Sequence, residues 1–355
     1  MNMMHTKLLE IIMVVDYKKS DQAVYMTELK DFLPEKIFDA HVHLFDGSCL
    51  PQGYEFPAKD CCRKFDGQFT LEHCLEYIRA MLPEQDFYLN SFGFPSVEFS
   101  LDAGAQYTGG ISDNKRYFGM AMVSPHDSIA SVQKRISANR LIGYKPYLNF
   151  VDWKKKDEIT IFDMLPDEQM EYADANGLAV TLHIPRPNRL ADPVNQQQMI
   201  ELCRRYPNLK VIFAHIGRAY YMQNVSGYLD GIAGCPNAYI DTAMVNHEGV
   251  LEYAFNNFPR ERILFGSDAP IALLRGKSVE INNQYAYLMG EDYQIGSAIY
   301  DAGHTVKFTS FYYEQLRAIK LAAVRAGLSC KEIENIFSGN AFRLFSEIAA
   351  KLKYI

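Results

Sequence analysis

Short apolar segments alternate with segments of helical length along most of this chain. Eight apolar segments are rich in β-branched residues and end near proline or glycine, as buried parallel strands do; they cover residues 37–43, 87–94, 117–125, 141–148, 179–185, 210–217, 238–245 and 262–270. Helices are predicted beside them at residues 71–81, 129–139, 161–176, 194–206, 221–229, 249–258 and 311–326. This alternation predicts an α/β fold in which eight strands close into a barrel. An open doubly wound sheet is the alternative, but no G-x-G-x-x-G sequence follows an early strand.

The chain has 355 residues, a length that one barrel with insertions can reach. Residues 1–36 are predicted to form a helical extension packed on the barrel, and residues 37–355 the catalytic barrel domain. Two long segments, 44–68 and 271–310, are predicted as loops over the barrel mouth. The second segment, rich in tyrosine and glycine, is assigned to the substrate pocket, with a packing insertion or a dimer contact as the alternative.

Composition excludes several classes of partner. A formal net charge of -7 argues against a general nucleic-acid binder, which needs a basic face. Seven cysteines without a C-x-x-C pair predict reduced thiols in a cytoplasmic protein. The apolar stretch Leu8–Val15 contains Glu10 and is too short to span a membrane, so we expect an amphipathic helix there and no membrane contact.

The first predicted strand, IFDAHVH at residues 37–43, carries polar side chains at every second position. Asp39, His41 and His43 therefore point to one face of the strand. Two imidazoles on one face at a strand end can hold a divalent metal. An isolated H-x-H is more often a pair of ordinary hydrogen-bonded histidines, so the metal interpretation depends on the later strands. Asp39, one layer below His41, could orient a ligand.

Four further polar residues lie at the carboxyl ends of later predicted strands: Lys145, His183, His215 and Asp268. Barrel enzymes build their sites on this face. Each residue alone has an ordinary explanation, such as a buried hydrogen bond or a turn cap. That explanation would have to hold at five strands at once, so the set predicts a metal-dependent active site.

The residue types define the expected chemistry. His41, His43, His183 and Asp268 would form a four-ligand shell for one divalent ion, most simply Zn²⁺, with Mn²⁺ or another divalent ion as alternatives. Such an ion lowers the pKa of bound water to about 7 and polarises a carbonyl. His215 then remains as the general acid or base, and Asp268 could share that role by taking a proton from water.

The motifs DAHVH, TLHIPR, FAHIGR, LFGSDAP and GNAFRLF, in this order between Ile37 and Phe345, resemble the amidohydrolase-related family of the metal-dependent amidohydrolase superfamily. The resemblance implies a distorted (β/α)8 TIM barrel that usually holds one metal ion. It also implies that the four residues named above are the metal ligands, and that His215 acts in proton transfer or water activation.

Three basic residues near the predicted site have open roles. By the same resemblance, Lys145 could bridge two metals as a carboxylated lysine. It could more simply pair with a substrate carboxylate or a neighbouring acid. Arg186 and Arg218 each follow a site histidine by three residues, where an arginine could hold a substrate carboxylate through two parallel hydrogen bonds. A surface salt bridge is the alternative for either arginine.

We expect a hydrolase that uses a metal-activated water on a lactone, ester or amide of a small acid. The alternative is a metal-dependent non-oxidative decarboxylase of an aromatic or semialdehyde acid, because the same ligands serve both reactions. A barrel kept as a non-enzymatic binding protein is a third possibility, against which the intact ligand set speaks. The expected partner is a small acidic substrate, and a homodimer is compatible with the family.

Overall fold

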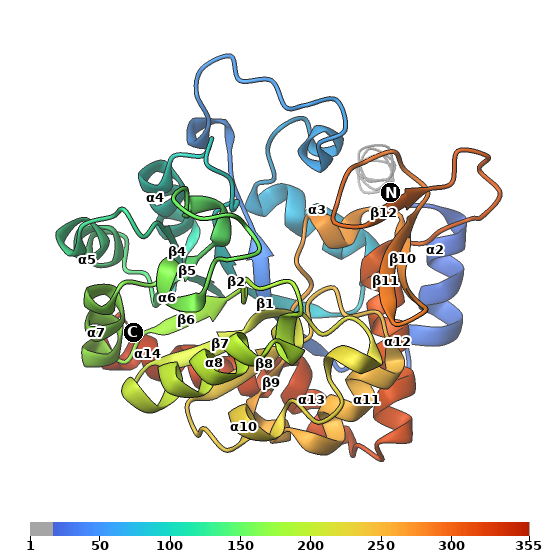
Figure 1. The fold of residues 1–355 in the computed structure, drawn as a ribbon. Coiled ribbons are helices and arrows are strands. Elements are labelled where there is room, and N and C mark those ends of the chain that lie inside the picture. Colours follow the sequence, from blue (N-terminus) through green and yellow to red (C-terminus); the bar gives the residue numbers. More distant parts are fainter. Residues whose placement is uncertain (1–16, 355) are drawn as a thin grey trace.

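The computed structural model describes residues 17–354 and shows a barrel of parallel strands (Figure 1). Its strands are β1 (Lys36–His43), β2 (Asp86–Phe92), β3 (Tyr117–Gly119), β4 (Ala121–Val123), β5 (Gly143–Pro146), β6 (Ala179–Leu182), β7 (Lys210–Phe213), β8 (Ala238–Asp241) and β9 (Ile263–Leu264). The predicted strand at 117–125 is present as β3 and β4. Between them the backbone N–H of Met120 donates to the carbonyl of Ser91 over 2.8 Å. This bond continues the pairing across the interruption.

Backbone hydrogen bonds join the first and last strands of the barrel. The N–H groups of Ala40 and His43 donate to the carbonyls of Phe265 and Ala269 over 2.9 and 2.7 Å. In the other direction, the N–H of Asp268 donates to the carbonyl of His41 over 2.8 Å. The segment after β9 therefore runs beside β1, although β9 itself is only two residues long. This is the predicted (β/α)8 architecture, with the strand irregularity expected of a distorted barrel.

Helices surround the strands, namely α3 (Leu71–Met81), α4 (Leu101–Ile111), α5 (Ile129–Ala138), α6 (Ile161–Met164), α7 (Asp167–Asn176), α8 (Pro193–Arg205), α10 (Asp230–Ala233), α11 (Glu248–Asn257), α12 (Phe311–Arg325), α13 (Cys330–Glu334) and α14 (Asn340–Lys351). Two predicted helices are wrong in extent. Residues 161–176 form two helices because Pro166 lacks an N–H and disfavours helical backbone before it. Residues 221–229 contain only one 3₁₀ turn, and Gly227 at φ 83° interrupts any longer helix.

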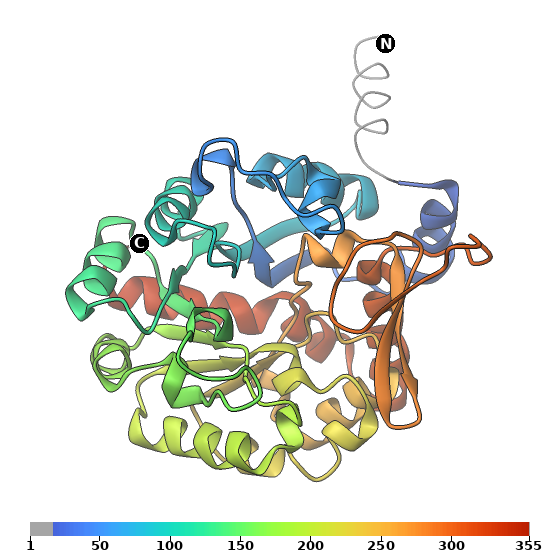
Figure 2. The same cartoon turned by 45° about the horizontal axis from the view of Figure 1, so that its top comes forward.

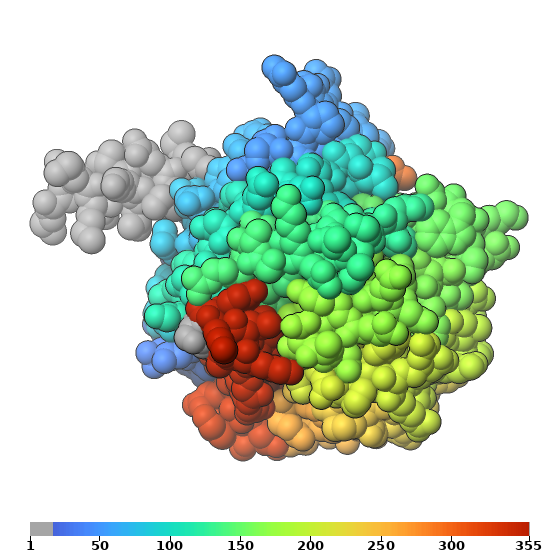
Figure 3. All heavy atoms as spheres, turned by 90° about the vertical axis from the view of Figure 1, so that its left-hand side faces the viewer, coloured from blue at the N-terminus to red at the C-terminus, as the bar shows by residue number. Residues whose placement is uncertain are grey.

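The barrel interior is filled at the end where the strands begin. Phe38, Ile142, Ala179 and Ile212 pack there against α14, which closes that end. The C-terminal segment reaches the surface beside the helices of earlier units, where Tyr354 packs under Arg140 (Figure 3). With one end closed, the opposite end is left for a site.

The chain before β1 packs on the barrel wall. Within residues 17–36 the structure has α2 (Lys19–Val24) and a π-helical turn (Tyr25–Leu29). Tyr25 and Leu29 are buried, and Asp21 forms an ion pair of 2.8 Å with Arg275. The helix expected at Leu8–Val15 lies outside the described residues. Within residues 17–354, no helix is both long and apolar enough to cross a membrane.

The segment 271–310 is a small sheet and not the loop that the sequence suggested (Figure 2). Strands β10 (Gly276–Ile281) and β11 (Gln284–Met289) form a hairpin, and β12 (Ala298–Tyr300) pairs with β11. Asn282 and Asn283 turn the hairpin at φ 51° and 58°, as a tight hairpin turn requires. We call residues 271–310 the roof. An ion pair of 2.6 Å between Lys64 and Glu291 ties the roof to the loop at 44–68.

Candidate active site

The carboxyl ends of the strands surround a cavity of about 210 Å³. Six residues predicted for the site line it: His43, Lys145, His183, His215, Arg218 and Asp268. The roof contributes Tyr285, Tyr287 and Ile295, while Tyr147 and Tyr220 complete an aromatic wall. The cavity is thus polar on the barrel side and aromatic on the roof side.

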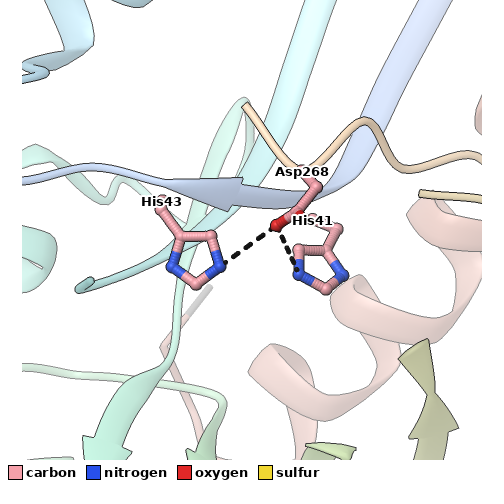
Figure 4. A group of neighbouring side chains, drawn as sticks. All are labelled: His41, His43 and Asp268. Atoms are coloured by element: carbon pink, nitrogen blue, oxygen red, sulfur yellow. Dashed lines mark ion pairs between the residues drawn. The ribbon is translucent and has the colours of Figure 1, made fainter. Parts of the chain in front are cut away.

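His41 and His43 meet the same carboxylate (Figure 4). Alternation along β1 puts both buried imidazoles on one face. Their Nε2 atoms each lie 3.3 Å from Oδ1 of Asp268. Asp268 has a left-handed backbone, φ 72°, which turns its side chain back towards β1. One ligand-type atom from each residue lies within 4.8 Å of the others, a grouping that could hold a metal ion.

Lys145 places its amino group between the two imidazoles. Its Nζ lies 2.6 Å from Nε2 of His41 and 3.2 Å from Nε2 of His43. The ammonium also stands 4.0 Å from the centroid of the Phe92 ring. Burial lowers the pKa of Lys145 to about 7, although Asp268 acts to raise it. Lys145 therefore contacts the predicted ligands themselves.

Burial decides the protonation of most site residues. It lowers the pKa of His43 to about 3, with Lys145 adding to the effect, and lowers the pKa of His215 to about 4. Burial alone would raise the pKa of Asp268, but hydrogen bonds from His41 and His43 outweigh it and hold that pKa well below its ordinary range. Burial and Lys145 act to lower the pKa of His41, yet Asp241 and Asp268 raise it overall. At neutral pH the site thus contains neutral His43 and His215 beside an ionised Asp268.

His215 stands on a strained turn after β7. Residues 214–217 were predicted as the end of a strand, but His215, Ile216 and Gly217 adopt left-handed backbone with φ of 58°, 53° and 64°. Its Nδ1 donates to the carbonyl of Ala243 over 2.8 Å. This bond leaves Nε2 as the ring nitrogen available to the cavity.

His183 lines the cavity but stands apart from the group formed by His41, His43 and Asp268. The centroid of its ring lies 5.4 Å from that of His215 and 4.8 Å from that of Tyr147. Its Nδ1 is buried and has no hydrogen-bond partner among the described residues. Its predicted role as fourth ligand stays a prediction.

The two candidate arginines differ in position. Arg218 lines the cavity, donates from one terminal nitrogen to the carbonyls of Ile184 and Pro185, and keeps a buried Nε without a partner among the described residues. Arg186 instead pairs with Asp192 over 3.2 Å and does not line the cavity. Of these two arginines, Arg218 is the one that lines the cavity.

Sequence reasoning missed Asp241, the last residue of β8. Its Oδ2 lies 2.8 Å from Nδ1 of His41. Asp39, expected to orient a ligand, accepts hydrogen bonds from the backbone N–H groups of His41 and Ser267, and its expected role stays a prediction. The available signal was charge: Asp241 is the single charged residue within the predicted strand at 238–245, whose carboxyl end was expected farther along the chain. The roof tyrosines were missed individually because the hairpin was not recognised.

The residues present fit a divalent cation. Two imidazole nitrogens and one carboxylate oxygen are the donor types of zinc sites. The basic Nζ of Lys145 already lies between the two imidazoles, 2.6 and 3.2 Å from their Nε2 atoms. Nδ1 of His43 donates to the carbonyl of Gly93 over 2.7 Å, which turns its Nε2 to the site.

Fold and site together define a (β/α)8 barrel with a metal-type centre at the carboxyl ends of its strands. Residues 38–346 match the family model described as amidohydrolase. The chain therefore belongs to the amidohydrolase family, a metal-dependent family of enzymes.

Several solved structures share the fold. An amidohydrolase from Burkholderia multivorans with bound HEPES is 14% identical, with a TM-score of 0.56 over 87% of this chain and 98% of that one. A 4-oxalomesaconate hydratase from Rhodopseudomonas palustris is 15% identical, with a TM-score of 0.52 over 89% and 98%. A putative 2-pyrone-4,6-dicarboxylic acid hydrolase from Pseudomonas putida is 16% identical, with a TM-score of 0.51 over 88% and 98%. Among curated proteins, none matches this chain.

Proposed function

We propose that this protein is a metal-dependent hydrolase of a lactone, ester or amide of a small, carboxylate-bearing substrate. The observation that carries the proposal is the convergence of His41, His43 and Asp268, two of which line a cavity together with His215 and Arg218. His41, His43 and Asp268 would hold the ion, with His183 as the fourth ligand. When bound, a divalent ion supplies Lewis acidity towards a carbonyl and towards water.

His215 is proposed to move the proton. A general base must be neutral at the working pH, and burial keeps His215 in that state. The bond from its Nδ1 to Ala243 fixes the hydrogen on that nitrogen, so Nε2 offers a lone pair to the cavity. After it takes a proton from water, the same nitrogen can return it to the leaving group.

Arg218 is proposed to bind the substrate carboxylate. Two backbone carbonyls hold one of its terminal nitrogens, and its Nε has no partner among the described residues although it is buried. A buried donor without a partner is costly, so a ligand acceptor there would be favourable. The Pseudomonas putida protein named above is a putative hydrolase of a dicarboxylic acid. This supports screening acids first.

The test begins with metal analysis of protein purified without chelator or nickel affinity resin, followed by a screen of lactones, esters and amides of small acids. We expect about one divalent ion per chain and a cleaved acid as product. Release of CO₂ without cleavage would replace the hydrolase with the decarboxylase alternative. Two ions per chain would point to Lys145 as a bridging ligand.

Two arginine variants test the substrate class. Arg218→Gln should raise KM for acid substrates and affect neutral analogues less, because it removes a charge-assisted contact. Arg186→Gln is the matched control, since Arg186 also follows a site histidine by three residues but pairs with Asp192. Equal effects of the two substitutions would contradict the proposed contact.

A further inference from the structure

We propose that Asp241 is a positioning residue whose single carboxylate sets both the ring hydrogen of His41 and the place of His215. The inference rests on the proposed metal-dependent function, because it concerns how the chain prepares a ligand and a base. Asp241 is fully buried at the end of β8 and lines no part of the cavity. It acts through the residues that it holds.

The two carboxylate oxygens have separate tasks. Oδ2 accepts from Nδ1 of His41 over 2.8 Å. Oδ1 accepts from the backbone N–H of His215 over 2.8 Å and from that of Ala243 over 3.1 Å. One buried group thus joins the end of β1 to the turn after β7.

The contact with His41 selects a tautomer. A carboxylate offers only acceptors, so Nδ1 of His41 must carry the hydrogen and Nε2 keeps its lone pair. Nε2 is the atom that faces Asp268 and Lys145. A divalent ion needs that lone pair, and the opposite tautomer would block it.

The contact with His215 supports unfavourable backbone. Left-handed conformation is sterically unfavourable for a residue with a side chain, and His215 and Ile216 both adopt it. Oδ1 of Asp241 anchors this turn at the His215 N–H. Ala243, also bound to Oδ1, in turn accepts the hydrogen of the His215 ring through its carbonyl. Asp241 therefore orients the ring of His215 indirectly.

Asp241→Asn separates the two tasks. The amide oxygen can still accept from the backbone N–H groups of His215 and Ala243. The amide nitrogen then faces Nδ1 of His41, so two donors oppose each other unless His41 moves its hydrogen to Nε2. That shift removes the metal-binding lone pair.

Asp39→Asn is the matched control. Asp39 is also a buried carboxylate next to His41, but its Oδ1 accepts from the backbone N–H groups of His41 and Ser267 and bonds no imidazole. An asparagine oxygen can do the same. The substitution makes the same change in side-chain size and atom type without touching an imidazole.

The experiment titrates Zn²⁺ into chelator-treated wild-type and variant proteins with a competing chromophoric chelator. Asp241→Asn should bind Zn²⁺ about 10–100-fold more weakly, the usual effect of losing a partner of a ligating histidine, whereas Asp39→Asn should bind like the wild type. Nitrogen-15 NMR of labelled histidines in the metal-free proteins reads the tautomer of neutral His41. We expect hydrogen on Nδ1 in the wild type and on Nε2 in Asp241→Asn.

Equal zinc affinity of Asp241→Asn and the wild type would overturn the inference while leaving the proposed function intact. Hydrogen on Nε2 of His41 in the wild type would overturn it as well, and this measurement decides even if the variant fails to fold. A wild-type protein that binds no Zn²⁺ but shows the Nδ1 hydrogen would reject the proposed function instead.

Discussion

Replacing His215 by asparagine should change how the stability of the metal-free protein depends on pH. The unfolded chain carries this histidine with a pKa of about 6.5. In the folded protein burial lowers the pKa of His215 to about 4. Between these two pKa values the unfolded state binds a proton at His215 and the folded state does not. Lowering the pH therefore favours unfolding.

The size of this pH effect on stability follows from the range between the two pKa values of His215. The stability that neutral, buried His215 contributes is fully present above about pH 6.5. It is lost as the pH falls towards the pKa of His215 in the folded protein. From pH 7.5 to pH 5 the wild type should lose about 2 kcal/mol through His215, at about 1.4 kcal/mol per pH unit below 6.5. His215→Asn has no such group, so its stability difference from the wild type should shrink by that amount.

Urea unfolding in the presence of chelator, at several pH values from 7.5 to 5, measures this difference. Other titrating groups, including Asp39 with its pKa raised to about 7 by burial, contribute alike to both proteins and cancel. Tyr220→Phe is the control: its ring lies 6.0 Å from that of His215, and burial raises the tyrosine pKa far above the window. A stability difference between wild type and His215→Asn that stays constant with pH would refute the buried neutral state.

Three further outcomes are expected. His41→Ala should lose bound metal in elemental analysis, whereas His215→Asn should retain it while turnover falls about 10²–10⁴-fold; loss of metal from both would contradict the division of roles. Gly143→Ala should destabilise the protein by about 1–3 kcal/mol in urea unfolding, since a Cβ there would lie 2.0 Å from the carbonyl oxygen of Ala179. Gly110→Ala, with open space around the added carbon, should instead be neutral or stabilising by up to about 1 kcal/mol, and equal effects would contradict the packing argument. Chelator treatment should lower the thermal midpoint of the wild type, and Zn²⁺ should restore it by preferential binding to the folded state.

The barrel could be predicted from the sequence because its signals are local. A strand buried on both faces must be apolar, and a proline such as Pro166 or a glycine such as Gly227 marks where helices break. The broken helices were nevertheless missed, since apolar spacing continues across Pro166. The roof hairpin was missed because two asparagines at positive φ give a weaker signal than asparagine followed by glycine.

The candidate site residues could be predicted only in part, because local sequence signals do not set the distances between distant strands. Alternation along β1 determined that His41 and His43 share a face, whatever lies opposite. Their meeting with Asp268, more than two hundred residues later, depends on how β1 pairs with the segment after β9. Strand pairing across the barrel also determines three other positions. It places Lys145 between the imidazoles, Arg218 rather than Arg186 at the cavity, and Asp241 behind His41. Sequence patterns constrain which face a side chain occupies, whereas distances between side chains are set by strand pairing and packing across the whole barrel.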